Sequence, residues 1–175
     1  MKKLFFLTLV VSLVSCGSNA EKQLRDIRQL QANKSLRTSD TLINSYIRFA
    51  DQFPDHDSAV RFLFKAARAS VRANKIMQGI RLDERIIEKY PKDTMYRPES
   101  MINAGMNYSH MPDVANAKKL WEMFLKEYPG HPRSADIRIM AEEAGMSEEE
   151  KTRRFWERFE KLRMQDSIAR AGKIQ

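Results

Sequence analysis

The sequence predicts an all-α protein built from stacked helical hairpins, and three observations lead to this prediction. An aromatic residue followed by proline recurs along the 175-residue chain, and the prolines of these pairs are spaced 37 and then 38 residues apart. The three pairs are Phe53-Pro54, Tyr90-Pro91 and Tyr128-Pro129. Apolar residues between these points recur at the three- and four-residue spacing of a helix face. No run alternates Val, Ile or Thr with polar residues between turns, as a strand would. A motif that recurs every 37–38 residues in a helical chain is typical of a solenoid of two-helix units.

The clearest unit runs from Met101 to Pro129. Gly105 is followed by Tyr108, Ala117 and Pro129 at offsets of 3, 12 and 24 residues. Gly105 and Ala117 would let two antiparallel helices approach closely, and Pro129, which lacks a backbone N–H, would end the second helix. A glycine inside a helix costs about 1 kcal/mol relative to alanine, so a packing role is expected for it. The arrangement resembles the tetratricopeptide-repeat (TPR) signature of small, aromatic and proline residues at these places.

The preceding segment looks like an imperfect copy of this unit. Ala67 and Gly79 take the places of the two small residues. Asp83 takes the place of Trp121, the large residue expected to close the later hairpin. The middle copy is therefore expected to pack less well. The predicted TPR-like repeat region covers residues 23–146.

Residues 1–15 are predicted to be a lipoprotein signal peptide. Lys2 and Lys3 precede an apolar run that is too short to span a bilayer, which needs about 20 residues. The run then ends in Leu13-Val14-Ser15-Cys16, which resembles the lipobox of bacterial lipoproteins. In that family the cysteine is acylated and becomes the first residue of the mature chain, so Cys16 is the predicted lipidation site. Residues 16–22 would be the lipidated cysteine and a short tether. A plain secretory signal with a coincidental cysteine is the alternative.

The turns between the predicted helices carry a second resemblance. The segments are Phe53-Pro54-Asp55-His56, Leu63-Phe64-Lys65-Ala66-Ala67, Lys89-Tyr90-Pro91 and Tyr128-Pro129-Gly130-His131-Pro132. Together they resemble the small TPR lipoproteins of outer-membraned bacteria, related to the BamD family of the barrel-assembly machine and to the C-terminal TPR domain of the CpoB family. The resemblance implies a non-catalytic adaptor held at the outer membrane, with the periplasmic leaflet favoured over the cell surface. The partner contacts of BamD do not carry over, because this chain has room for some three repeats instead of about five.

The charge of the chain favours anionic partners. The formal net charge is +8, from 31 basic and 23 acidic residues. Acidic protein segments, lipid head groups and cell-wall polymers all meet this requirement, whereas a merely solvated basic surface is the alternative. Nucleic acid is not expected. The three histidines have no metal-ligand spacing, and neither a catalytic motif nor a phosphate-binding loop occurs, so we expect no enzyme, metal or cofactor.

A basic stripe on the helix predicted from about Ser58 to Ala73 is the candidate site. In TPR folds the first helix of each pair lines the groove. The groove positions here are Arg61, Phe64, Arg68 and Arg72, followed by Ile102, Asn103 and Met106. Basic groups would clamp a carboxylate, while the remaining residues seat the backbone of an extended acidic peptide or a C-terminus. Binding of anionic polymer or lipid head groups by the basic surface is the alternative.

The segment 147–175 is predicted to be a C-terminal capping helix. Ser147 and Glu150 form a capping-box pattern at its start. Its apolar residues recur at helical spacing: Phe155, Phe159 and Leu162, with Trp156 beside them. Because the last unit of a solenoid needs a cover with one polar face, this helix is expected to serve as the cap. Its rival role is an amphipathic helix that binds a partner or lies on a membrane.

Overall fold

The computed structural model describes residues 19–111 and 113–171, which form helices joined by turns, with no strand among them. The first helix covers residues 19–32. The later elements are η1 (Lys34–Leu36), α2 (Asp40–Gln52), α3 (Ala59–Arg72), α4 (Ile76–Lys89), α5 (Tyr96–Ser109), α6 (Val114–Glu127), α7 (Ser134–Glu143) and α8 (Glu148–Ala171). The predicted signal peptide, Cys16 and the start of the tether lie outside the described residues.

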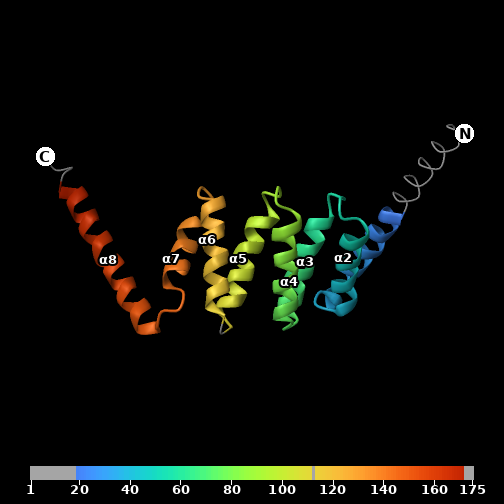
Figure 1. Ribbon diagram of the computed structural model, residues 1–175, viewed down its shortest axis with the longest axis horizontal. Coiled ribbons are helices and arrows are strands. Elements are labelled where there is room, and N and C mark those ends of the chain that lie inside the picture. The colour runs from blue at the N-terminus through green and yellow to red at the C-terminus, as the bar shows by residue number, and fades with distance from the viewer. Residues whose placement is uncertain (1–18, 112, 172–175) are drawn as a thin grey trace, which may run out of the picture.

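The helices from α2 to α7 stand side by side in chain order, as Figure 1 shows. Each of them packs against its neighbours in sequence, and α3 also contacts α5. Helix 19–32 and α8 consequently lie at opposite ends of the row. This arrangement confirms the predicted all-α solenoid of helical hairpins. No helix among the described residues combines the length and the apolar content needed to cross a membrane.

The buried residues form two clusters along the row. One cluster is shared by helix 19–32, α2, α3 and α4, and the other by α4, α5, α6 and α7. Gly105 packs closely against the indole of Trp121. A Cβ added at Gly105 would lie only 2.3 Å from Trp121 Nε1. The small residue expected at this position therefore has the packing role predicted for it.

Two turns that join hairpins share one construction. His56 Nδ1 accepts a hydrogen bond from the Ser58 backbone N–H at 3.0 Å, and His131 Nδ1 accepts one from Arg133 at 3.2 Å. Each imidazole also packs edge-on against an aromatic ring of the preceding helix, with centroids about 5 Å apart. The pairs are Phe49–His56 and Phe124–His131. The histidines therefore hold turns in place, which explains why both follow an aromatic residue and a proline.

The long C-terminal helix begins at the predicted capping box. Ser147 N–H donates to Glu150 Oε2 at 3.0 Å, and Glu150 N–H donates to Ser147 Oγ at 3.2 Å. Helix α8 then leaves the row at an angle (Figure 1). Ion pairs between Arg154 and Glu142 and between Arg158 and Glu143 connect it to α7.

The packing expected of a cap is not observed for α8. Trp156 and Leu162 are 55% and 64% exposed, and Phe155 and Phe159 are exposed as well. Met164 and Ile168 are exposed on the opposite side of the same helix. Apolar and charged residues thus alternate around α8, so that it has no single apolar stripe to bury against α7. The prediction of the helix was correct and the prediction that its apolar face covers the last repeat was wrong.

Candidate functional site

Helix α3 carries four cations and no acidic residue. The cations are Arg61, Lys65, Arg68 and Arg72, all of them exposed. None of the four takes part in an ion pair within the described part of the chain. The ion pairs lie on other elements, for example Arg85 with Asp51 at 2.6 Å and Arg133 with Glu99 at 3.3 Å. No ion pair within the described residues therefore compensates the positive charge of α3.

Two of the predicted groove residues meet across the repeats. Arg68 Nη1 on α3 donates to Asn103 Oδ1 on α5 at 2.9 Å. The Asn103 side chain is buried, and its Nδ2 has no hydrogen-bond partner among the described residues. This contact connects the first helices of two successive hairpins, which is how a continuous binding face would have to be built.

Other predicted groove residues lie elsewhere. Ile102 is fully buried in the second core cluster, so it cannot contact a ligand and its assignment to the groove was wrong. The physical reason is helical phase, because Ile102 is one residue away from the face that carries Asn103 and Met106. Phe64 is half-buried against the Tyr96 ring, with centroids 5.2 Å apart. Met106 is half-buried and its sulfur lies 3.8 Å from Arg133 Nη2.

Arg61 and Arg72 lie toward opposite ends of α3. Arg61 Nη2 donates to Ser58 Oγ at 3.0 Å, and its guanidinium lies 5.5 Å from the centre of the Phe62 ring. Arg72 instead lines a hollow of about 350 Å³ between α2 and α3. The other residues of this hollow are Gln31, Arg37, Leu42, Tyr46, Lys65 and Ala69. The four cations of α3 are therefore distributed along the helix, with Arg72 and Lys65 at the hollow.

Sequence reasoning missed three polar residues of this hollow, Gln31, Arg37 and Tyr46. They come from helix 19–32, from the residue after η1 and from α2, so no spacing within one helix relates them. Tyr46 also belongs to the apolar pattern of α2, and its ring is indeed buried. Only the pairing of the helices brings these residues beside α3.

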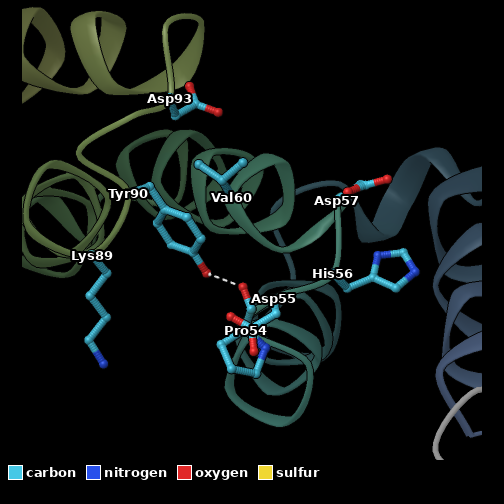
Figure 2. A pocket seen from close by; sticks show the side chains of 8 residues that line it. All are labelled: Pro54, Asp55, His56, Asp57, Val60, Lys89, Tyr90 and Asp93. Carbon is cyan, nitrogen blue, oxygen red and sulfur yellow. Dashed lines mark hydrogen bonds between the residues drawn. The ribbon is translucent and has the colours of Figure 1, made fainter. Parts of the chain in front are cut away.

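A larger hollow of about 610 Å³ lies where the turn after α2 meets the turn after α4. Figure 2 shows that its polar side chains diverge, with Lys89 and His56 extending away from Tyr90 on opposite sides. Tyr90 Oη donates to the Pro54 carbonyl at 3.1 Å, and Asp93 accepts from the Met95 N–H at 3.0 Å at the start of α5. Within residues 19–111 and 113–171, no three metal-binding side chains are grouped as a metal site requires. Tyr90, Asp93 and His56 therefore hold the turns.

A buried carboxyl lies behind the α3 face. Asp83 on α4 is 1% exposed, and neither of its oxygens has a hydrogen-bond partner within the described residues. Burial raises the pKa of Asp83 to about 7, against the opposite effects of the nearby Ser100 hydroxyl and the Arg68 charge. The Ser100 hydroxyl is itself fully buried and is not in hydrogen-bond geometry with the carboxyl. The middle hairpin therefore contains a polar junction at the place where the next one has Trp121.

Comparison with protein-family models, with curated proteins and with solved structures finds no match to this chain. The resemblance to TPR lipoproteins therefore depends on the motif residues of the sequence alone, and it remains a prediction.

Proposed function

We propose that this protein is a non-catalytic adaptor lipoprotein, which binds an extended acidic segment of another envelope protein along α3 and the adjoining part of α5. In this proposal Cys16 carries the lipid anchor and holds the protein at the outer membrane, on the periplasmic side. The solenoid then presents its α3 face to the partner. The proposed activity is binding, without catalysis.

The observation that supports the proposal is the uncompensated charge of α3. A helix with four cations and no acid attracts negatively charged groups, and the cations recur along its length as an extended ligand would need. The charge of the first helices differs along the row, since α5 carries both Arg97 and Glu99, and α7 carries Arg138 and three acidic residues, two of which form ion pairs with α8. The cations of α3 would therefore hold the acidic part of an extended segment.

Binding of an anionic cell-wall polymer or of lipid head groups is the second candidate, and the same cations support it. The two candidates differ in their response to salt. Exposed charges are screened within about 8 Å at physiological ionic strength, so purely electrostatic binding weakens steeply as salt rises. A protein segment that also contacts the half-buried Phe64 and Met106 should be retained at salt concentrations that release a polymer.

Charge reversal on α3 tests the proposal. The double variant Arg68→Glu/Arg72→Glu and a matched control, Arg81→Glu on the exposed side of α4, would be expressed as full chains in the host. The partner recovered with the wild-type chain by affinity purification should be lost with the α3 variant and retained with the control. Equal recovery with all three chains would contradict the proposal. Circular dichroism of each variant checks that the fold is intact.

A further inference from the structure

The hollow between α2 and α3 is distinguished by the charge of its lining. Three of its residues are cations, Arg37, Lys65 and Arg72, and none is acidic. Within the described part of the chain, none of these three forms an ion pair. Like charges gathered in a recess repel one another. An anion that enters would be attracted by all three cations and would reduce this repulsion.

The surroundings of Lys65 agree with this description. Partial desolvation beside α2 and, second, the positive charge of Arg61 lower the pKa of the Lys65 ammonium. A nearby carboxylate would have the opposite effect, and no acidic side chain lines the hollow. The recess is therefore a place where the protein has positive potential and no anion of its own.

The floor of the hollow is formed by a packed aromatic ring and contains a further donor. The Tyr46 ring is buried and stacks on Phe62, with centroids 5.3 Å apart. Its hydroxyl accepts a hydrogen bond from Gln31 Nε2 at 2.9 Å, which leaves the hydroxyl proton available for donation to a ligand. Leu42 and Ala69, both buried, provide an apolar wall beside it.

The size of the hollow limits what it can bind. A volume of about 350 Å³ is near the lower end of the range for small-ligand sites, so it suits one or two residues of a chain. Arginine guanidinium groups match the planar carboxylate, to which they can donate two hydrogen bonds at once. A carboxylate attached to a small apolar group would satisfy both the cations and the apolar wall.

We propose that this hollow is a carboxylate-binding site, in which Arg37, Lys65 and Arg72 surround the anion and Tyr46 donates a hydrogen bond to it. The carboxylate belongs to an extended peptide, either as its C-terminus or as an acidic side chain. The inference rests on the proposed function in one respect, namely that the peptide is part of the segment bound along α3. The geometry of the hollow is independent of that partner.

A peptide titration followed by NMR tests the site. The ¹⁵N-labelled full chain in detergent micelles would be titrated with N-acetyl-Ala-Ala-Leu as the free acid, with its C-terminal amide, and with N-acetyl-Ala-Glu-Ala-Leu amide. Arginine Nε–H signals report the contact, and the variants Arg37→Gln and Arg72→Gln assign them. The free acid, the Glu-containing amide or both should shift the Arg37 and Arg72 signals with saturation, whereas the amide without a carboxylate should not. Arg72→Gln and Lys65→Gln should each weaken binding about tenfold.

Arg81→Gln is the matched control and should leave the affinity unchanged. The inference would be overturned if the amide without a carboxylate bound within twofold of the free acid, or if exposed arginines such as Arg81 shifted together with Arg37 and Arg72. Tighter binding of inorganic phosphate than of either carboxylate peptide would also overturn it. The titration contains no cellular partner. If the peptides do not bind while charge reversal on α3 still removes the partner in cells, only the carboxylate-site inference is contradicted. If the peptides bind as expected while charge reversal leaves the partner in place, the adaptor proposal is contradicted.

Discussion

Replacing Gly105 by alanine should destabilise the protein, although alanine is the better helix former. The added Cβ would lie 2.3, 2.7 and 2.9 Å from Nε1, Cδ1 and Cε2 of Trp121, whereas ordinary contacts are 3.4 Å or longer. Trp121 is 3% exposed, so its indole has little room to move away. Overpacking of a buried site costs up to about 3 kcal/mol, and the gain in helix propensity returns about 1 kcal/mol. We expect a net loss of about 2 kcal/mol in the free energy of unfolding.

Urea denaturation followed by far-UV circular dichroism measures this loss. At this chain length, a loss of about 2 kcal/mol should lower the melting temperature by about 4–8 °C. Gly130→Ala is the control, because a Cβ at Gly130 meets nothing within 4 Å and should leave the urea midpoint within error of the wild type. A midpoint for Gly105→Ala at or above that of the wild type would refute the argument that close helix approach under Trp121 requires glycine.

Three further predictions concern charge and α8. Because Asp83 has a pKa raised to about 7, the folded state holds this proton more tightly than the unfolded state, and stability falls as pH rises from about 4 to 7. Asp83→Asn should therefore exceed the wild type in melting temperature above pH 7 and lose that advantage at pH 5; a constant difference would contradict this. Arg97 is 8% exposed and donates to Ile87 O, Glu127 and Tyr128. Its replacement by methionine should therefore lower the free energy of unfolding by about 2–3 kcal/mol, and replacement by lysine should recover only part of this loss in thermal melts. Deleting residues 148–175 should change the melting temperature by less than about 3 °C, since the aromatic residues of α8 are exposed; a fall of 8 °C or more would make it a true cap.

The fold could be predicted because its signals are local. Pro54, Pro91 and Pro129 end helices, and this constraint acts through the missing N–H of the residue itself. Gly105 and Ala117 are small at the point where two helices approach, and a packed hairpin leaves few alternatives to that pattern. The polar junction at Asp83 was visible in part, because an aspartate at the place of Trp121 indicates a weaker core.

The rest of the site depends on which helices meet. Arg37 follows a short 3₁₀ turn and has no periodic partner, so only the docking of helix 19–32 and α2 on α3 places it beside Arg72. Ile102 was assigned to the groove because it neighbours Asn103, but a shift of one residue turns a side chain by about 100° on a helix. The packing of α8 was predicted from Phe155, Phe159 and Leu162 alone, whereas Met164 and Ile168 on the opposite side of the same helix show that it has no single apolar face.

Site-specific photo-cross-linking in intact cells tests most directly whether the α3 face is a binding surface. A photoreactive amino acid would replace Arg68 on α3 or Arg81 on α4, and mass spectrometry would identify the products. We predict that one envelope protein is cross-linked at position 68 and is absent at position 81. The same products at both positions, or no protein product at position 68, would contradict the account.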